Sequence, residues 1–183
     1  QNPGFDLRAM IRAVIQNLRG QSIQSGASTI TMQLIRNTLF DVEDRYDRSM
    51  NRKLREIFLA YQLSQRYSKD EILERYLNEI NYGNLAYGIE AASRTYFDKS
   101  ARELNLAEAS LLAGLPQLPS DYNPYINFRA AKERQAEVLG LMVRQGYISE
   151  EVAEAALRQP LKLSPVRSDI RAPHFVMYVR DLL

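Results

Sequence analysis

Cysteine is absent from the 183-residue sequence, and histidine occurs only once. Without cysteine, neither disulfide bonds nor thiolate metal sites can form. No apolar run approaches the roughly 20 residues that a membrane-spanning helix needs. The net charge is only +2, because lysine and arginine barely exceed aspartate and glutamate. So small an excess gives no indication of nucleic-acid binding.

The remaining composition is that of an ordinary folded domain. Hydrophobic residues make up 45% and charged residues 25% of the sequence, as in soluble globular proteins, and the length predicts one domain with a buried core. Apolar residues recur at helical spacing almost throughout, without the alternation typical of strands. The sequence therefore predicts an all-α fold, with helices over about 7–18, 28–39, 48–67, 69–80, 87–96, 106–114, 128–145 and 150–159.

Polar side chains crowd the start of the helix predicted over 28–39. Ser28, Thr29, Gln33 and Asn37 supply hydroxyl and amide groups there. Because a helix N-terminus offers free backbone N–H groups and the positive end of the dipole, these residues suit a phosphate or sugar hydroxyls. The alternative is an N-cap serine followed by polar residues that face solvent, and residue types alone favour it.

Basic residues form a second group. Arg48 and Arg52 are four positions apart, so they share a helix face, and Arg36 and Lys53 complete the group. Guanidinium forks and an ammonium group can hold a pyrophosphate and stabilise it as a leaving group. The alternative is a solvated charged face, neutralised by the acidic residues of 41–47, and the charge pattern alone favours this alternative.

Glu56 follows Arg52 by four positions on the same helix face. The pattern is that of an exposed ion pair, which contributes little to stability. Replacing Arg52 or Lys53 with alanine is therefore expected to leave the fold almost unchanged.

The helix that begins at Lys69 is predicted to be mainly architectural, with Ser68 and Glu71 as its capping box. Its expected core face is Ile72, Leu73, Tyr76 and Leu77, and Glu74 is expected to anchor neighbouring loops.

Three segments, 26–37, 52–56 and 69–78, resemble in this order the second, third and fourth signature motifs of the peptidoglycan glycosyltransferases, glycosyltransferase family 51. These are the polymerising domains of class A penicillin-binding proteins and of monofunctional transglycosylases. The resemblance implies a lysozyme-like, two-lobed helical domain with a small membrane-proximal jaw. The implied reaction polymerises lipid II into β-1,4-linked glycan strands and releases undecaprenyl pyrophosphate.

The resemblance also implies roles for individual residues. Glu56 matches the second essential carboxylate of the active cleft and is implied to be catalytic, whereas Glu74 and Asn78 match structural positions of the fourth motif. The resemblance also implies a divalent cation, Mg²⁺ or Mn²⁺, bound at the pyrophosphate. The implied substrate-binding residues are Ser28, Thr29, Gln33, Arg36, Asn37, Arg48, Arg52 and Lys53.

The implied partners are lipid II and the growing lipid-linked glycan strand, with no nucleic acid. The helix predicted over 7–18 carries Arg8, Arg12 and Arg19 beside its apolar stripe, as a helix on an anionic membrane surface does. An ordinary core-facing helix fits the same pattern equally well. The implied location is the outer face of the bacterial cytoplasmic membrane, anchored by a transmembrane segment that is not in this chain.

We expect residues 1–159 to form the glycosyltransferase domain and residues 160–183 to be a linker toward a transpeptidase domain. Asn2 stands where the first motif has a histidine, and the glutamate that acts as general base in the family would precede Gln1. Residues 1–183 are therefore expected to be inactive by themselves. Further departures are Met32, Asp98 and Gln135, where glutamine, glycine and arginine are usual.

Two other classes of function stay open. A lytic enzyme that cleaves peptidoglycan would share a lysozyme-like fold and a catalytic glutamate, but it would not need the basic group for a pyrophosphate. A non-catalytic module that binds lipid-linked glycan would need no general base.

Overall fold

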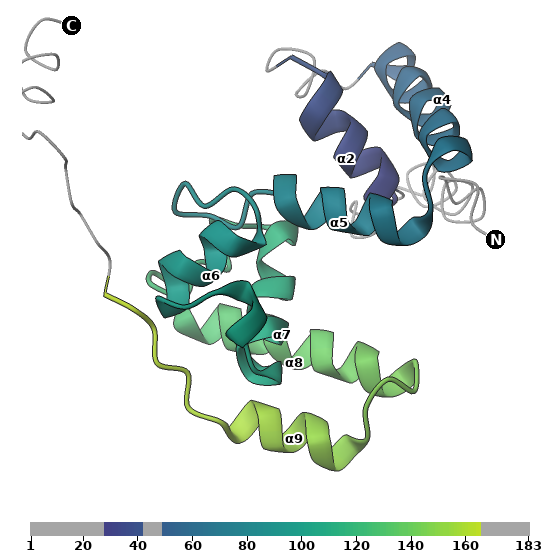
Figure 1. The fold of residues 1–183 in the computed structure, drawn as a ribbon. Coiled ribbons are helices and arrows are strands. Elements are labelled where there is room, and N and C mark those ends of the chain that lie inside the picture. Colours follow the sequence, from purple (N-terminus) through teal and green to yellow (C-terminus); the bar gives the residue numbers. More distant parts are fainter. Residues whose placement is uncertain (1–27, 42–48, 166–183) are drawn as a thin grey trace, which may run out of the picture. The chain divides into compact units, whose positions relative to one another are not determined.

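The computed structural model describes residues 28–41 and 49–165 (Figure 1). These residues form helices joined by loops, and their sole strand-like pairing is an isolated bridge between Asn81 and Tyr87. The predicted all-α class is therefore confirmed. The chain divides into two compact units, residues 1–92 and 93–183. The helix predicted over 7–18 lies outside the described residues.

The first unit contains helices α2 (Ile30–Leu39), α4 (Met50–Arg66) and α5 (Lys69–Glu79), and α2 packs against both α4 and α5. Its core includes Met32, Ile35, Phe40 and Ala60. Helix α2 begins later than predicted, because its N-cap is Thr29 and not Ser28. The Thr29 hydroxyl accepts the free N–H of Met32, 3.3 Å away.

Helix α5 begins with the capping box predicted at Ser68 and Glu71. Ile72 is buried as expected, but the prediction for Leu73 is wrong, since its side chain is 42% exposed. After the helix, Gly88 has a φ of +83°, and a Cβ there would lie 2.6 Å from the backbone oxygen of Asn78. The backbone of Asn78 therefore has an architectural role, because only glycine permits this close approach.

Helix α6 (Ile89–Phe97) crosses the division between the units. It is followed by Asp98, whose φ of +55° is in the left-handed region. This conformation explains why glycine is usual at the position, and aspartate tolerates it better than most residues.

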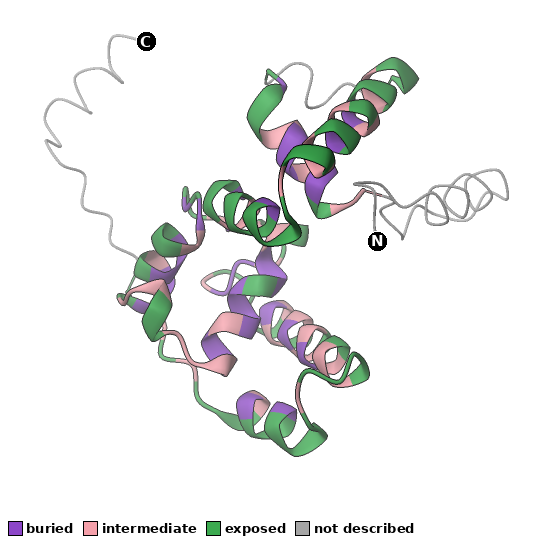
Figure 2. Ribbon diagram, turned by 45° about the vertical axis from the view of Figure 1, so that its right-hand side comes forward, coloured by how far each residue is buried: buried purple, intermediate pink, exposed green. Residues whose placement is uncertain are grey.

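The second unit contains α7 (Leu106–Gly114), α8 (Phe128–Arg144) and α9 (Glu150–Arg158), together with the short 3₁₀ turns Ala101–Glu103 and Leu115–Gln117. Helix α7 packs against α8 and α9. The small side chains Ala107, Ala153 and Ala156 surround Leu139 in its core. Figure 2 shows buried and exposed residues side by side on α8 and α9, as expected for amphipathic helices, whereas α7 is buried on most of its surface.

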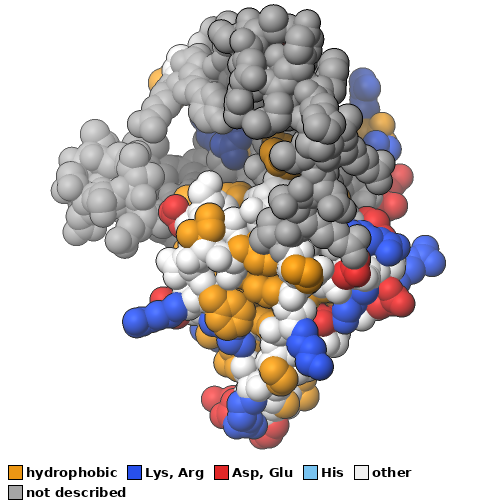
Figure 3. All heavy atoms as spheres, turned by 90° about the vertical axis from the view of Figure 1, so that its left-hand side faces the viewer, with side chains coloured by type: hydrophobic (Ala, Val, Ile, Leu, Met, Phe, Trp, Pro, Cys, Tyr) orange, Lys and Arg blue, Asp and Glu red, His pale blue; other side chains and the backbone are white. Residues whose placement is uncertain are grey.

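The surface is mixed in character. On the face drawn in Figure 3, hydrophobic side chains of the described residues lie among basic and acidic ones. Within residues 28–41 and 49–165, no helix combines the length and apolar character required to cross a membrane.

Candidate active site

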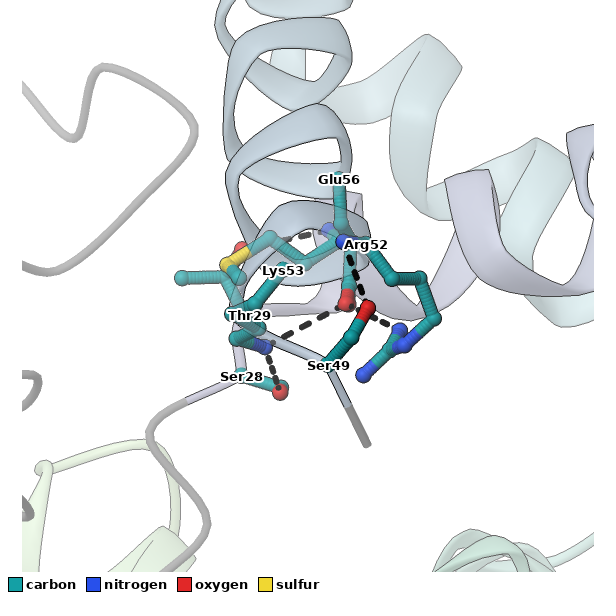
Figure 4. A network of polar contacts seen from close by, with 7 residues as sticks. Ser28, Thr29, Ser49, Arg52, Lys53 and Glu56 are labelled. Carbon is teal, nitrogen blue, oxygen red and sulfur yellow. Dashed lines mark hydrogen bonds and ion pairs between the residues drawn. The ribbon is translucent and has the colours of Figure 1, made fainter. Parts of the chain in front are cut away.

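The candidate site is built at the N-terminal end of α4. Ser49 caps this helix by accepting the N–H of Arg52 at 3.1 Å. One turn further on, the carboxylate of Glu56 points between the side-chain nitrogens of Arg52 and Lys53 (Figure 4). Its Oε2 atom accepts from the Arg52 guanidinium at 2.8 Å and from the Lys53 ammonium at 3.3 Å. The i+3 and i+4 spacing of the helix thus places two cations on one carboxylate oxygen.

Lys53 also joins α4 to the start of α2. Its Nζ donates to Ser28 Oγ at 2.8 Å, across 25 positions of sequence. Ser28 directly precedes the N-cap of α2, so this bond brings the second and third sequence motifs together. Figure 4 shows the resulting cation cluster, which consists of Ser28, Arg52, Lys53 and Glu56, with its polar contacts as dashed lines.

Arg36, on α2, belongs to the same electrostatic environment. Burial lowers the pKa of Lys53, the nearby Glu56 carboxylate opposes this by favouring the ammonium, and Arg36 and Arg52 lower the pKa further. Burial and the Glu56 carboxylate have the larger effects on this pKa, and Arg36 and Arg52 add a smaller repulsion between like charges. A multiply charged anion would relieve that repulsion.

The cluster is more buried than the sequence predicts. The Glu56 side chain is fully buried, and the side chains of Arg52 and Lys53 are 12% and 25% exposed. The interpretation as an exposed ion pair is therefore wrong. The physical reason is that α2 packs across this face of α4, and a sequence pattern on one helix does not reveal what covers it.

The carboxylate is only half satisfied. Glu56 Oε1 is buried and has no hydrogen-bond partner, although most buried polar atoms in proteins have at least one. Such an atom often marks a functional site. Both cations therefore share Oε2, and together they carry one positive charge more than the single carboxylate neutralises.

The other predicted residues take different positions. Thr29 caps α2, and Gln33 accepts a hydrogen bond from Tyr76 of α5 at 3.2 Å. Asn37 is half-buried on the same face of α2 as Gln33. Arg48 lies outside the described residues. The bond to Tyr76 is the feature that sequence reasoning missed, because Tyr76 carries only the pattern of a core residue.

Glu74 and Asn78 lie away from the cation cluster, on a groove of about 520 Å³ between α2, α4 and α5. Glu74 is exposed and makes no hydrogen bond or ion pair within the described part of the chain. The expectation that its side chain anchors neighbouring loops stays a prediction, because residues 1–27 and 42–48 lie outside the described part of the chain. The groove is lined by Leu34, Ile35, Thr38, Leu39, Leu63, Tyr67, Glu71, Glu74, Arg75, Asn78 and Glu79.

The site offers little to a divalent cation. Among the described residues no group of three or more carboxylate, histidine or cysteine side chains could hold a metal. Glu56 is the carboxylate of the cluster, and its Oε2 is already paired with two cations. Hard cations such as Mg²⁺ are usually held by one or two carboxylates and by phosphate oxygens, so the divalent cation at the pyrophosphate stays a prediction.

Comparisons with known proteins agree with the sequence motifs. Residues 1–143 match the transglycosylase family model. Penicillin-binding protein 2D of Bacillus subtilis is 46% identical over 175 residues, which are 94% of this chain and 25% of that protein. Penicillin-binding protein 1A of Pseudomonas aeruginosa is 44% identical over 161 residues, 88% of this chain and 19% of that protein. The chain thus spans a quarter or less of these relatives.

Structure gives the same result. The crystal structure of Penicillin-Binding Protein 1A from Haemophilus influenzae matches with a TM-score of 0.54 and 33% sequence identity, over 84% of this chain and 19% of that one. The all-α, lysozyme-like class implied by the resemblance agrees with this match. Family model, relatives and fold therefore lead to one assignment: the chain belongs to the transglycosylase family, as a glycosyltransferase domain of the class A penicillin-binding protein type.

Proposed function

We propose that this chain is a peptidoglycan glycosyltransferase domain, which polymerises lipid II into β-1,4-linked glycan strands and releases undecaprenyl pyrophosphate. The proposal is carried by one observation, the buried Glu56 carboxylate that holds Arg52 and Lys53 at 2.8 and 3.3 Å. Family membership supplies the reaction class, and the geometry explains how the leaving pyrophosphate is bound and stabilised.

In this mechanism the cation cluster binds the pyrophosphate of the donor. Bond cleavage at C1 of the donor sugar leaves additional negative charge on the phosphate oxygens. Arg52, Lys53 and Arg36 stabilise this charge without having to reorganise, because Glu56 and Ser28 already hold the first two in place. Preorganised charge in a site of low water content is usually the largest contribution to catalysis.

Glu56 acts through its two cations in this proposal. Its fully buried side chain makes contact with Arg52 and Lys53, so its role is to orient them and to limit their mutual repulsion. The acceptor 4-hydroxyl needs a separate general base, which the family resemblance assigns to the glutamate of the first motif. The predicted catalytic role of Glu56 is thus proposed here as positioning.

The remaining predicted residues complete the donor site in the proposal. Ser28 and Thr29 lie at the N-terminus of α2, where backbone N–H groups favour phosphate oxygens. Gln33 and Asn37 offer amide groups to sugar or phosphate oxygens, and Arg48 adds a further cation. A Mg²⁺ or Mn²⁺ ion stays a prediction, and no step depends on it.

The wider setting is also proposed from the resemblance. The domain would comprise residues 1–159, with 160–183 as a linker, and it would act at the outer face of the bacterial cytoplasmic membrane. Residues 7–18 would contact the membrane surface, and the chain would bind the growing glycan strand as well as lipid II. The packing of α9 against α7 and α8 supports including residues up to 158 in the domain.

The test is polymerisation of labelled lipid II, followed by gel separation of the glycan products. It compares residues 1–183 with the same residues preceded by a Glu-Asp-x-x-Phe segment like that of the first motif. We expect polymer from the second protein and its loss in the Lys53→Ala variant. Cleavage of preformed glycan would instead indicate a lytic enzyme, and binding without turnover by either protein would indicate a binding module.

A further inference from the structure

A hydrogen bond joins the fourth sequence motif to the second. The hydroxyl of Tyr76, on α5, donates to Gln33 Oε1, on α2, at 3.2 Å and across 43 positions of sequence. Both side chains are half-buried where the two helices pack together. Burial raises the pKa of Tyr76 and nearby Arg36 partly opposes this, so the hydroxyl remains a protonated donor near neutral pH.

The bond leaves one side of the glutamine amide available. A glutamine side chain has one acceptor oxygen and two N–H donors. Tyr76 occupies the oxygen, whereas Nε2 has no hydrogen-bond partner within residues 28–41 and 49–165. An amide without the tyrosine could rotate and present its oxygen where its N–H groups had been, which would repel an anionic or carbonyl-rich ligand.

The position of Gln33 relates this amide to the proposed donor site. Gln33, Arg36 and Asn37 are spaced at i, i+3 and i+4, so they share one face of α2. The charge of Arg36 acts both on the Tyr76 hydroxyl and on the Lys53 ammonium. The tyrosine therefore lies in the same electrostatic neighbourhood as the cation cluster, although it belongs to a helix that the proposed mechanism does not use.

We propose that Tyr76 is a positioning residue, which fixes the orientation of the Gln33 amide so that both N–H donors face a phosphate or sugar oxygen of the lipid-linked substrate. This role rests on the proposed function. It extends the site from α2 and α4 to α5 and gives one polar atom of the fourth motif a purpose beyond packing.

A double-mutant cycle tests the proposal in the active, N-terminally extended protein. Tyr76→Phe removes only the hydroxyl, and Gln33→Met removes the amide at nearly constant volume. We expect Tyr76→Phe to lower kcat/KM for lipid II about three- to tenfold, the size of one lost hydrogen bond, mainly through KM. In the Gln33→Met background the same change should have no effect. Losses that multiply in the double variant would overturn the proposal.

Two controls separate positioning from packing. Tyr61→Phe also removes a hydroxyl in the first unit, on the exposed face of α4, and should leave kcat/KM unchanged. Gln33→Glu keeps an acceptor for Tyr76 but has no N–H donors and adds a negative charge, so it should reduce kcat/KM at least as much as Gln33→Met. Full activity of Gln33→Glu would contradict the assigned role of the amide.

A measurement without turnover distinguishes this inference from the proposed function. In ¹⁵N-labelled protein, Tyr76→Phe should shift the two side-chain N–H resonances of Gln33, and Tyr61→Phe should not. Unchanged Gln33 resonances in Tyr76→Phe would overturn the proposal that the Tyr76 hydroxyl holds the Gln33 amide. Absence of polymer from the unsubstituted protein would count against the proposed function, while the resonances would still decide whether Tyr76 holds the amide.

Discussion

Each compact unit buries a glutamate beside a lysine, but the two carboxylates are satisfied in different ways. In the second unit, the Glu108 oxygens lie 2.7 and 2.9 Å from Lys99 Nζ, and Oε2 also accepts the backbone N–H of Asn105 at 3.0 Å. Both oxygens thus have partners, and the carboxylate closes the capping box of α7. In the first unit, both cations converge on Oε2 of Glu56, and Oε1 has no partner.

Under the proposed function, the difference separates a structural carboxylate from one that positions the cations of the donor site. Burying a charge is costly, and the cost is offset when every lone pair finds a donor, as at Glu108. Glu56 is less well compensated, yet it holds two cations close together and near the surface. This arrangement is the one that the proposed binding of a multiply charged anion would use.

Replacing each glutamate with glutamine breaks the comparison most strongly. Glu56→Gln removes the charge that holds Arg52 and Lys53, so we expect polymerisation to fall by more than about 100-fold. The loss of a buried charge interaction should also lower stability by about 1–3 kcal/mol. Lipid II polymerisation and thermal unfolding by circular dichroism measure the two effects.

Glu108→Gln is the matched control, since it makes the same chemical change in a buried carboxylate–lysine pair. We expect a similar loss of stability, with the polymerisation rate per folded molecule unchanged. Equal losses of activity in both variants would show that Glu56 acts by supporting the fold alone.

Substitution of Lys53 tests the charge itself. Lys53→Ala should reduce polymerisation more than about tenfold, because one cation of the pyrophosphate site is lost. It should also lower stability modestly, since the buried Glu56 keeps only Arg52 as an ionic partner. Substrate binding to the unsubstituted protein should weaken as salt is added. An activity that is insensitive to both changes would remove Lys53 from the donor site.

The pH dependence of Lys53 follows from its burial, which lowers its pKa below the ordinary value of 10.5. As pH rises through the lowered pKa, the ammonium loses its charge and donor binding should fall. In the same window the unfolded chain still keeps its proton, so the contribution of Lys53 to stability should rise with pH. Lys53→Arg keeps its charge at alkaline pH and should abolish the fall in binding, which calorimetric titrations at several pH values would measure.

Much of this could be predicted from the sequence. Helical periodicity and capping residues located the helices of the described region within a few positions, and the capping box predicted at Ser68 is present. The contact between Lys53 and Ser28 could be expected only from the family motifs. Burial of Glu56 and the bond between Tyr76 and Gln33 could not be predicted, because they depend on which helices pack together, and local patterns do not contain that information.

Gln135 offers a further test in the second unit, and arginine is usual at its position in the family. Its fully buried Nε2 donates to Ala107 O at 2.7 Å and to Ser110 Oγ at 3.2 Å, which joins α8 to α7. Gln135→Leu should cost about 1–2 kcal/mol, because it removes both hydrogen bonds between α8 and α7, although Ala107 O still accepts from the Ser110 hydroxyl. The melting temperature should fall by several degrees, while polymerisation by the folded fraction stays the same. A selective loss of activity would place α8 in the catalytic machinery.

The smallest effect is expected at Tyr125, which stacks on Tyr96 with ring centroids 5.4 Å apart. Its hydroxyl lies 2.8 Å from the backbone oxygens of Thr95 and of Ser164, and the Ser164 N–H donates to Tyr96 O at 2.8 Å. One hydroxyl hydrogen thus serves two carbonyls and ties the segment after α9 to the end of α6. Tyr125→Phe keeps the stacking and the backbone bond from Ser164 to Tyr96 but removes the bonds of the hydroxyl, so we expect a loss of about 0.5–1.5 kcal/mol. Backbone amide exchange should increase at Ser164 and stay constant in α2 and α4. Polymerisation should be unaffected, because the contact contains no charged group that could bind the donor. Reduced activity would mean that the backbone contacts of the second unit influence the cation site.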